Sequence, residues 1–232
     1  MRTAEREGSS LVDELWPAFT GSTQQLRVLR AELASGVPLG TTREGYPAVL
    51  ALVRPAPVRI AVVGQAWVAS LLAIRAAVLG TTTVIVTDRP APWHVLVRGV
   101  GGSHPFATVV DPAATGSLPP PSVAAPVFML HDGSAGGAEA VLARAPWQTS
   151  VHLVFRLGTS PSAVLDAADP VLVTPPQPDE VEQVLAALRL PDGLAGELAG
   201  MAPAEVLAVT RSGAAFVTVQ ATAGETAVLR AT

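Results

Sequence analysis

The chain has 232 residues, of which 49% are hydrophobic and 15% charged, and its mean hydropathy is +0.42. This length and composition exclude global disorder and are sufficient for a buried hydrophobic core. The 15 basic and 19 acidic residues leave a net charge of −4, which is too small to predict a nucleic-acid or membrane-surface partner.

Two residue types are absent from the sequence. Without cysteine, the chain has no disulfides, no thiol nucleophile and no cysteine-ligated metal cluster. All 15 basic residues are arginine, so the chain has no lysine for a Walker A phosphate loop, a Schiff base or a kinase-type phosphate contact. A GC-rich codon bias explains both absences without a functional cause.

The N-terminal part of the chain, residues 1–56, is expected to form a helix followed by a β hairpin. Ser9 and Ser10 are of the type that caps a helix N-terminus, and residues 39–53 alternate as two strands around a turn. The first residues are charged and precede no apolar segment, unlike a signal peptide. The most apolar helical stretch, 66–79, is too short to span a bilayer and contains Arg75.

The central part, residues 57–191, alternates between strand and helix patterns. Strands are predicted at 59–63, 83–87, 108–111, 126–130, 151–155 and 171–174, with helices at 67–79, 92–100 and 179–190. Strands separated by helical segments indicate a parallel sheet with helices on both faces. The predicted fold class is therefore α/β, a Rossmann-like and mostly parallel sheet.

The C-terminal part, residues 192–232, predicts a short helix followed by a β meander. The meander strands are expected at 206–210, 215–222 and 226–230. We expect the N- and C-terminal hairpins to pair in a small antiparallel β appendage that packs on the central core.

A nucleotide-binding pattern follows the first central strand. The strand at 59–63 precedes Gly64, and Asp88 follows the next strand at the distance of the acid in a dinucleotide fingerprint. However, Ala66 replaces the second glycine, and the bulky Trp67 begins the helix. The unit is then either purely structural or a nucleotide site in which Gly64, Ala66 and Asp88 bind the cofactor.

Five further residues follow predicted strands and form a candidate ligand cleft: Arg89, Trp93, His131, Asp132 and Ser134. A histidine beside an aspartate can supply a base or a metal ligand, and a serine can supply a hydroxyl. The structural alternatives are packing of Trp93 on the sheet and an ordinary turn at Asp132. Because the other histidines are scattered, we predict no metal site, no catalytic set and no cofactor.

Two segments carry a resemblance to a known family, the strand at 58–63 and the sequence TDRPAPW at 87–93. In them the chain resembles the cytosolic domain of EccE-type proteins, components of the actinobacterial type VII (ESX) secretion machinery. The resemblance extends over residues 39–190, and the N-terminal membrane helices of that family have no counterpart here. It implies a nucleotide-related fold that docks against protein partners in a membrane complex, and no catalytic residues carry over.

The first functional hypothesis is a non-catalytic scaffold or adaptor of a type VII secretion complex, not an enzyme, which acts through protein–protein contacts. The alternative is an enzyme or sensor that binds a nucleotide or nucleotide-sugar through residues 64–69 and Asp88. The expected partners are secretion-complex subunits or a second copy of the chain, with no nucleic acid and no direct membrane span. The expected location is the cytoplasm, with attachment to the inner face of the membrane through those partners.

Overall fold

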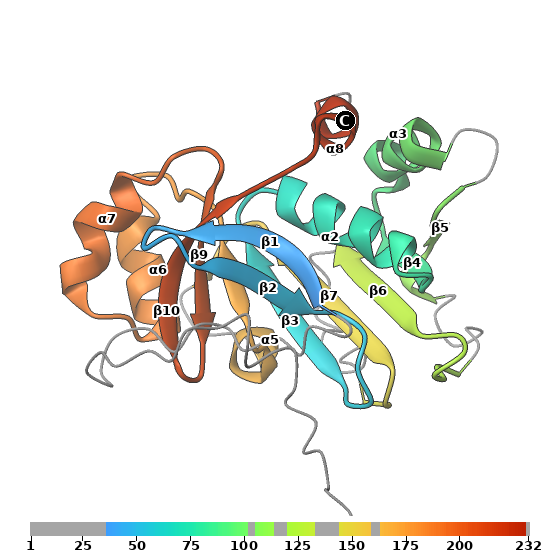
Figure 1. Ribbon diagram of the computed structural model, residues 1–232. Coiled ribbons are helices and arrows are strands. Elements are labelled where there is room, and N and C mark those ends of the chain that lie inside the picture. The colour runs from blue at the N-terminus through green and yellow to red at the C-terminus, as the bar shows by residue number, and fades with distance from the viewer. Residues whose placement is uncertain (1–35, 102–104, 114–119, 133–143, 159–162, 231–232) are drawn as a thin grey trace, which may run out of the picture.

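The computed structural model describes residues 36–101, 105–113, 120–132, 144–158 and 163–230 (Figure 1). The helix expected near Ser9 and Ser10 lies outside these ranges. The strands are β1 (Gly36–Thr42), β2 (Pro47–Ala51), β3 (Val58–Val63), β4 (Thr82–Thr87), β5 (Thr108–Val110), β6 (Val127–Asp132), β7 (Gln148–Val154), β8 (Val171–Val173), β9 (Glu205–Thr210) and β10 (Gly213–Val219).

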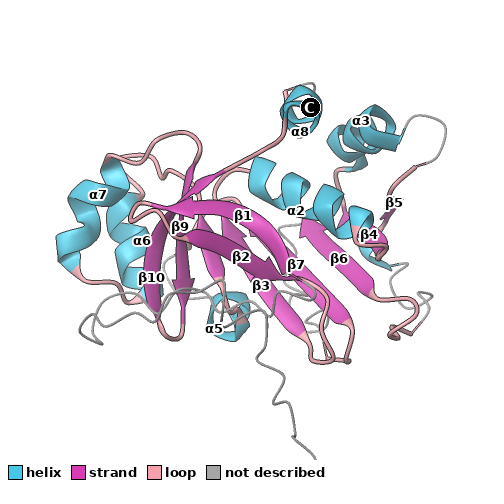
Figure 2. Cartoon of the chain, viewed as in Figure 1, coloured by secondary structure: helices cyan, strands magenta, loops and turns pink. Residues whose placement is uncertain are grey.

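The helices fall between and after these strands (Figure 2). They are α2 (Trp67–Val78), α3 (Pro90–Gly101), α5 (Ala163–Ala167), α6 (Val181–Leu188), α7 (Ala195–Ala199) and α8 (Ala223–Leu229), with a 3-10 turn at Asp192–Leu194. None of the helices in these described ranges combines the length and the hydropathy that crossing a bilayer requires.

All of these strands belong to one sheet, in the order β2-β1-β10-β9-β8-β3-β7-β6-β4-β5. The strands from β8 to β5 pair in parallel, whereas β9, β10, β1 and β2 extend the sheet by antiparallel pairs. The predicted α/β class and the pairing of the two terminal hairpins are confirmed. The antiparallel strands continue the main sheet, and the division at residues 56/57 and 191/192 stays a prediction.

Helices cover both faces of the sheet because successive strand residues point to opposite sides. Ile60 and Val62 of β3 lie in the core formed with α2 and α3, against which the end of α8 also packs. Ala61 and Val63 lie in the core formed with α5, α6 and α7. α2 is apolar apart from Ser70 and Arg75, and eight of its twelve residues are buried, as expected for a helix enclosed by other elements.

The strand order places a topological switch point in the middle of the parallel strands. β3 and β7 are neighbours, and their carboxyl ends lie at the same edge of the sheet. The connection leaving β3 forms α2 on one face, and the connection leaving β7 forms α5 on the other. Ligands of open α/β sheets bind in the crevice at such a point. A ligand site is therefore expected at the carboxyl ends of β3 and β7.

The prediction of a third meander strand at 226–230 is wrong, because these residues belong to helix α8 and the turn that follows it. The hydroxyl of Thr222 accepts a hydrogen bond from the backbone N–H of Glu225, at 3.2 Å. The Glu225 carboxylate in turn accepts one from the N–H of Thr222, at 2.7 Å. This capping box satisfies the first amides of α8 and starts a helix where apolar alternation suggested a strand.

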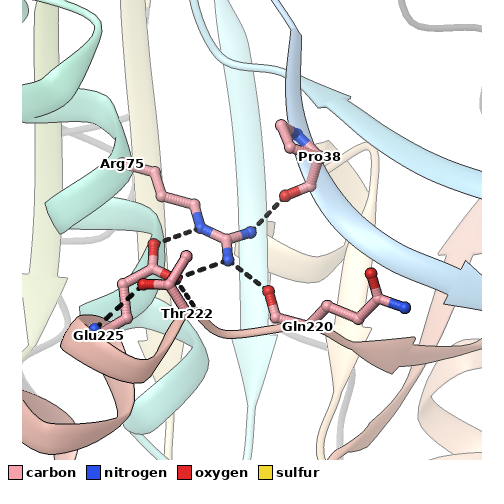
Figure 3. Close-up of polar contacts among 5 residues, drawn as sticks. All are labelled: Pro38, Arg75, Gln220, Thr222 and Glu225. Carbon is pink, nitrogen blue, oxygen red and sulfur yellow. Dashed lines mark hydrogen bonds and ion pairs between the residues drawn. The ribbon is translucent and has the colours of Figure 1, made fainter.

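Arg75 of α2 holds α8 in place (Figure 3). Its guanidinium donates to both carboxylate oxygens of Glu225, at 2.8 and 3.0 Å, and to the carbonyls of Gln220 and Pro38. The Arg75 side chain is only 11% exposed. The hydrogen bond from Arg75 lowers the pKa of Glu225. One arginine thus joins α2, β1, the end of β10 and α8.

We expect Arg75→Ala to detach α8 without unfolding the sheet. Loss of charged hydrogen bonds at a largely buried site should lower the free energy of unfolding by about 1.5–3 kcal/mol. Amide hydrogen exchange should show lost protection at residues 223–229, where the exposed control Arg98→Ala retains it. Full protection of α8 in Arg75→Ala would show that apolar packing alone holds the helix.

Candidate functional site at the carboxyl edge of the sheet

The turn from β3 into α2 requires a glycine. Gly64 has φ +99°, and its N–H donates to the carbonyl of Val154 at 2.8 Å. A Cβ atom at this position would lie 2.3 Å from the hydroxyl oxygen of Thr174. Both the backbone angle and the close approach of β8 therefore exclude other side chains. The predicted site residue Gly64 lies at the switch point.

Thr174, directly after β8, fixes the same turn. Its hydroxyl accepts from the N–H of Gln65 at 2.8 Å and donates to the carbonyl of Val63 at 3.2 Å. Ala66 is the N-cap of α2 and supplies no side-chain hydrogen bond. The first turn of α2 therefore begins at the carboxyl edge without a side-chain cap, and this is the helix end that favours anions.

Asp132, the last residue of β6, organises the neighbouring strand ends. Its side chain is 3% exposed and accepts from Arg89 Nη2 at 2.5 Å, from the hydroxyl of Thr87 at 3.3 Å and from the indole N–H of Trp93. The expectation of an ordinary turn at Asp132 is wrong, because the residue is buried in a strand. Burial of a carboxylate requires such donors, and α3 and the end of β4 supply them.

Arg89 lies partly over the sheet edge and partly in solvent. Its side chain is 56% exposed, and its Cζ atom lies 4.6 Å from the centroid of the Phe155 ring, a cation–π contact. Its Nε atom is 3.9 Å from a carboxylate oxygen of Asp88. Phe155 is 42% exposed, and the exposed Arg156 follows it directly. This edge therefore presents two arginines and an accessible aromatic ring.

The structure brings together Arg89, Trp93 and Asp132 but separates Asp88 from Gly64. β4 and β3 are three places apart in the sheet, which corresponds to roughly 14 Å. In a dinucleotide site the acid-bearing strand lies beside the glycine-bearing strand. The dinucleotide arrangement of Gly64, Ala66 and Asp88 is therefore not formed. Ser134, the remaining residue of the predicted cleft, lies outside the described residues.

His131 lies on the opposite face from Asp132, because adjacent strand residues alternate. Its ring stacks on that of His152 from β7, with centroids 4.5 Å apart and planes 16° apart. Both Nε2 atoms are buried without a hydrogen-bond partner within the described residues. Burial, with the nearby His152, lowers the pKa of His131 to about 3, and burial lowers that of His152 to about 4. Both rings are neutral at pH 7 and outside the site.

A small, shallow hollow that is open to solvent lies beside the switch point on the α6 side. It is lined by Gly64, Phe155, Arg156, Thr174 and Glu180, among others. Sequence reasoning did not select the last four of these residues, although Phe155 and Thr174 end predicted strands at 151–155 and 171–174. No group of three or more metal-ligating side chains occurs in the described part of the chain.

The two buried histidines make stability depend on pH. The unfolded chain binds protons at the ordinary histidine pKa of 6.5, whereas the folded chain binds them only near 3 and 4. The contribution of these two histidines to the free energy of unfolding is therefore fully present above pH 6.5. Below pH 6.5 the free energy of unfolding falls by up to about 1.4 kcal/mol per pH unit for each histidine. Chemical denaturation should show a loss of roughly 2–4 kcal/mol between pH 7 and pH 5.

The variant His152→Phe keeps an aromatic stack but removes one titrating group, so about half of this loss should disappear. The control His94→Ala changes an exposed histidine of α3 and should keep the full loss. Identical pH profiles for the wild type and His152→Phe would contradict the assignment of the loss to the stacked pair.

No protein-family model and no curated protein sequence matches the chain. Among solved structures it is similar to VirB4 of Thermoanaerobacter pseudethanolicus, with a TM-score of 0.55 and 9% identity over 83% of this chain and 98% of that one. It is also similar to the cytoplasmic domain of the type VII secretion ATPase EccC of Thermomonospora curvata, with a TM-score of 0.54 and 12% identity. That match covers 84% of this chain and 30% of the EccC chain.

These comparisons correct the first functional hypothesis. A non-catalytic scaffold, and with it the expectation that the chain is not an enzyme, rested on the altered glycine pattern and on the absence of a converging set of catalytic residues. The likeness in fold to the cytoplasmic domain of a secretion ATPase contradicts this hypothesis. At these identities the likeness shows the fold, shared with a type VII secretion protein, and gives no support to EccE-type proteins in particular.

Proposed function

We propose that the chain is the nucleotide-binding domain of a nucleotide-dependent enzyme and takes a nucleoside triphosphate at the carboxyl edge of β3, β6 and β7. The observation that carries this proposal is the switch point itself. There the start of α2, without a side-chain cap, lies at the same sheet edge as the exposed Arg89 and Arg156. The shared fold with the EccC domain supports the same ligand class.

Phosphate binding here does not use a lysine loop. The connection from β3 to α2 has only three residues, 64–66, and the sequence has no lysine. Backbone N–H groups at the start of a helix bind phosphate oxygens, and arginine matches phosphate with two parallel hydrogen bonds. The start of α2, Arg89 and Arg156 therefore supply the groups that a triphosphate needs.

The nucleoside end of the ligand needs a partly apolar surface. The Phe155 ring is accessible at the same edge and borders the hollow next to Gly64. Aromatic rings stack on nucleic-acid bases with little preference for one base over another. This surface supports binding of a nucleotide rather than of inorganic phosphate alone.

We further propose that the domain acts in the cytoplasm with the protein subunits of a secretion complex of the type VII class. The support is the likeness to the cytoplasmic domain of EccC and to VirB4. Association of several copies of the chain is the alternative partner arrangement, and size-exclusion chromatography with light scattering distinguishes the two.

Titration calorimetry of the full chain with ATP should give saturable binding, and Arg89→Ala should weaken it about 10- to 100-fold. That range is the effect of losing one charged hydrogen bond, about 1.5–3 kcal/mol. The matched control is Arg211→Ala, an exposed arginine in the turn between β9 and β10. Because β9 runs antiparallel to β8, that turn lies at the opposite edge of the sheet.

Equal losses in Arg89→Ala and Arg211→Ala would indicate general charge attraction and would contradict the proposed site. No heat of binding with ATP, ADP, GTP or UDP-sugars would contradict the proposed function.

A further inference from the structure

We infer that this site holds its nucleotide without Mg²⁺, with the guanidinium of Arg89 as the counter-charge of the phosphates. The inference rests on the proposed function. In P-loop ATPases, Mg²⁺ is held by a strand-end aspartate and by a loop serine or threonine. The donor groups at the corresponding edge of this sheet do not fit that ion.

Asp132 is the buried strand-end acid on the α2 side, and its oxygens are already used. One accepts from Arg89 at 2.5 Å, and the other accepts from Thr87 and Trp93. Mg²⁺ demands near-octahedral oxygen ligands at about 2.0–2.1 Å. A metal at Asp132 would have to displace Arg89, whose positive charge also repels it.

The other oxygen donors described at this edge are no better placed. The Thr174 hydroxyl both accepts from Gln65 and donates to Val63. Ser70 is buried in α2, and Trp67, Val68 and Ala69 before it carry no side-chain oxygen. Asp88 is exposed, but it lies beside the guanidinium of Arg89. Glu180 also lines the hollow beside Gly64, and its Oε2 atom accepts from the N–H of Gln177 at 3.0 Å. Each of these three carboxylates is therefore already engaged by an arginine or a backbone donor.

The guanidinium of Arg89 is held at the position where a positive charge would face the phosphates. Asp132 holds one end of this guanidinium and the Phe155 ring lies under it, while the side chain stays 56% exposed. An arginine held in this way presents its remaining N–H groups to an anion without a large loss of side-chain freedom on binding. The free ATP tetra-anion should then bind at least as well as its magnesium complex.

The test compares ATP titrations of the full chain in EDTA and in MgCl₂. We expect dissociation constants that agree within about threefold, or tighter binding in EDTA. Binding that is tenfold or more tighter in MgCl₂ overturns the inference and leaves the proposed function intact. No binding in either buffer overturns the proposed function and this inference with it.

Two variants separate an anchoring role of Asp132 from a metal-binding role. Asp132→Asn removes the charge that holds Arg89, so ATP binding should weaken by a similar factor in both buffers. A loss confined to MgCl₂ would identify Asp132 as a metal ligand and overturn the inference.

If Asp132→Asn fails to fold, Arg89→Ala provides a second test. Arg89 is largely exposed, so its replacement should disturb folding less than a change at the buried Asp132. Arg89→Ala frees one oxygen of Asp132, so the residual binding should become stronger with Mg²⁺ than without it. Binding in EDTA that is unchanged in Arg89→Ala would overturn the inference.

Discussion

The carboxylate of Asp132 sets the constraint on which the carboxyl edge of the sheet depends. A nearly inaccessible negative charge is tolerated only when hydrogen-bond donors and a positive charge surround it. Here the donors come from Thr87 at the end of β4, from Trp93 in α3 and from Arg89 between them. Satisfying Asp132 therefore fixes α3 against the sheet and places Arg89 over Phe155, which directly follows the neighbouring strand β7.

Helix α2 is held at both ends by interactions that are far apart in the sequence. At its start, Gly64 can turn only because it has no Cβ facing Thr174 after β8. Near its end, Arg75 binds Glu225 of α8 and the backbone carbonyls of Pro38 in β1 and of Gln220 after β10. The first turn of α2 is thus presented at the switch point by a rigid helix, which favours a preorganised anion site.

Local patterns in the sequence predicted most elements and the pairing of the two terminal hairpins, but not the order of the parallel strands. The apolar run at 59–63 and the period of 67–79 depend on near neighbours, and both formed as predicted. Strand order depends on long-range pairing, so Asp88 could be placed at a strand end but not three strands away from Gly64. The side chains that contact Asp132 and His131 could not be predicted for the same reason, because they come from other strands and helices. The capping box of Thr222 and Glu225 is local, so the sequence alone could have predicted it.

A shared fold leaves the chemistry of a site to its own residues, and the proposed site uses arginines and a helix start in place of a phosphate-binding lysine. A ¹H–¹⁵N NMR titration of the full chain with ATP locates the bound nucleotide directly. Binding at the proposed site should shift the backbone amides of residues 65–68, the signals of Arg89 and Arg156 and the Trp93 indole, with no shifts around Arg211. No shifts, or shifts confined to the edge of the sheet that carries Arg211, would contradict the proposed site.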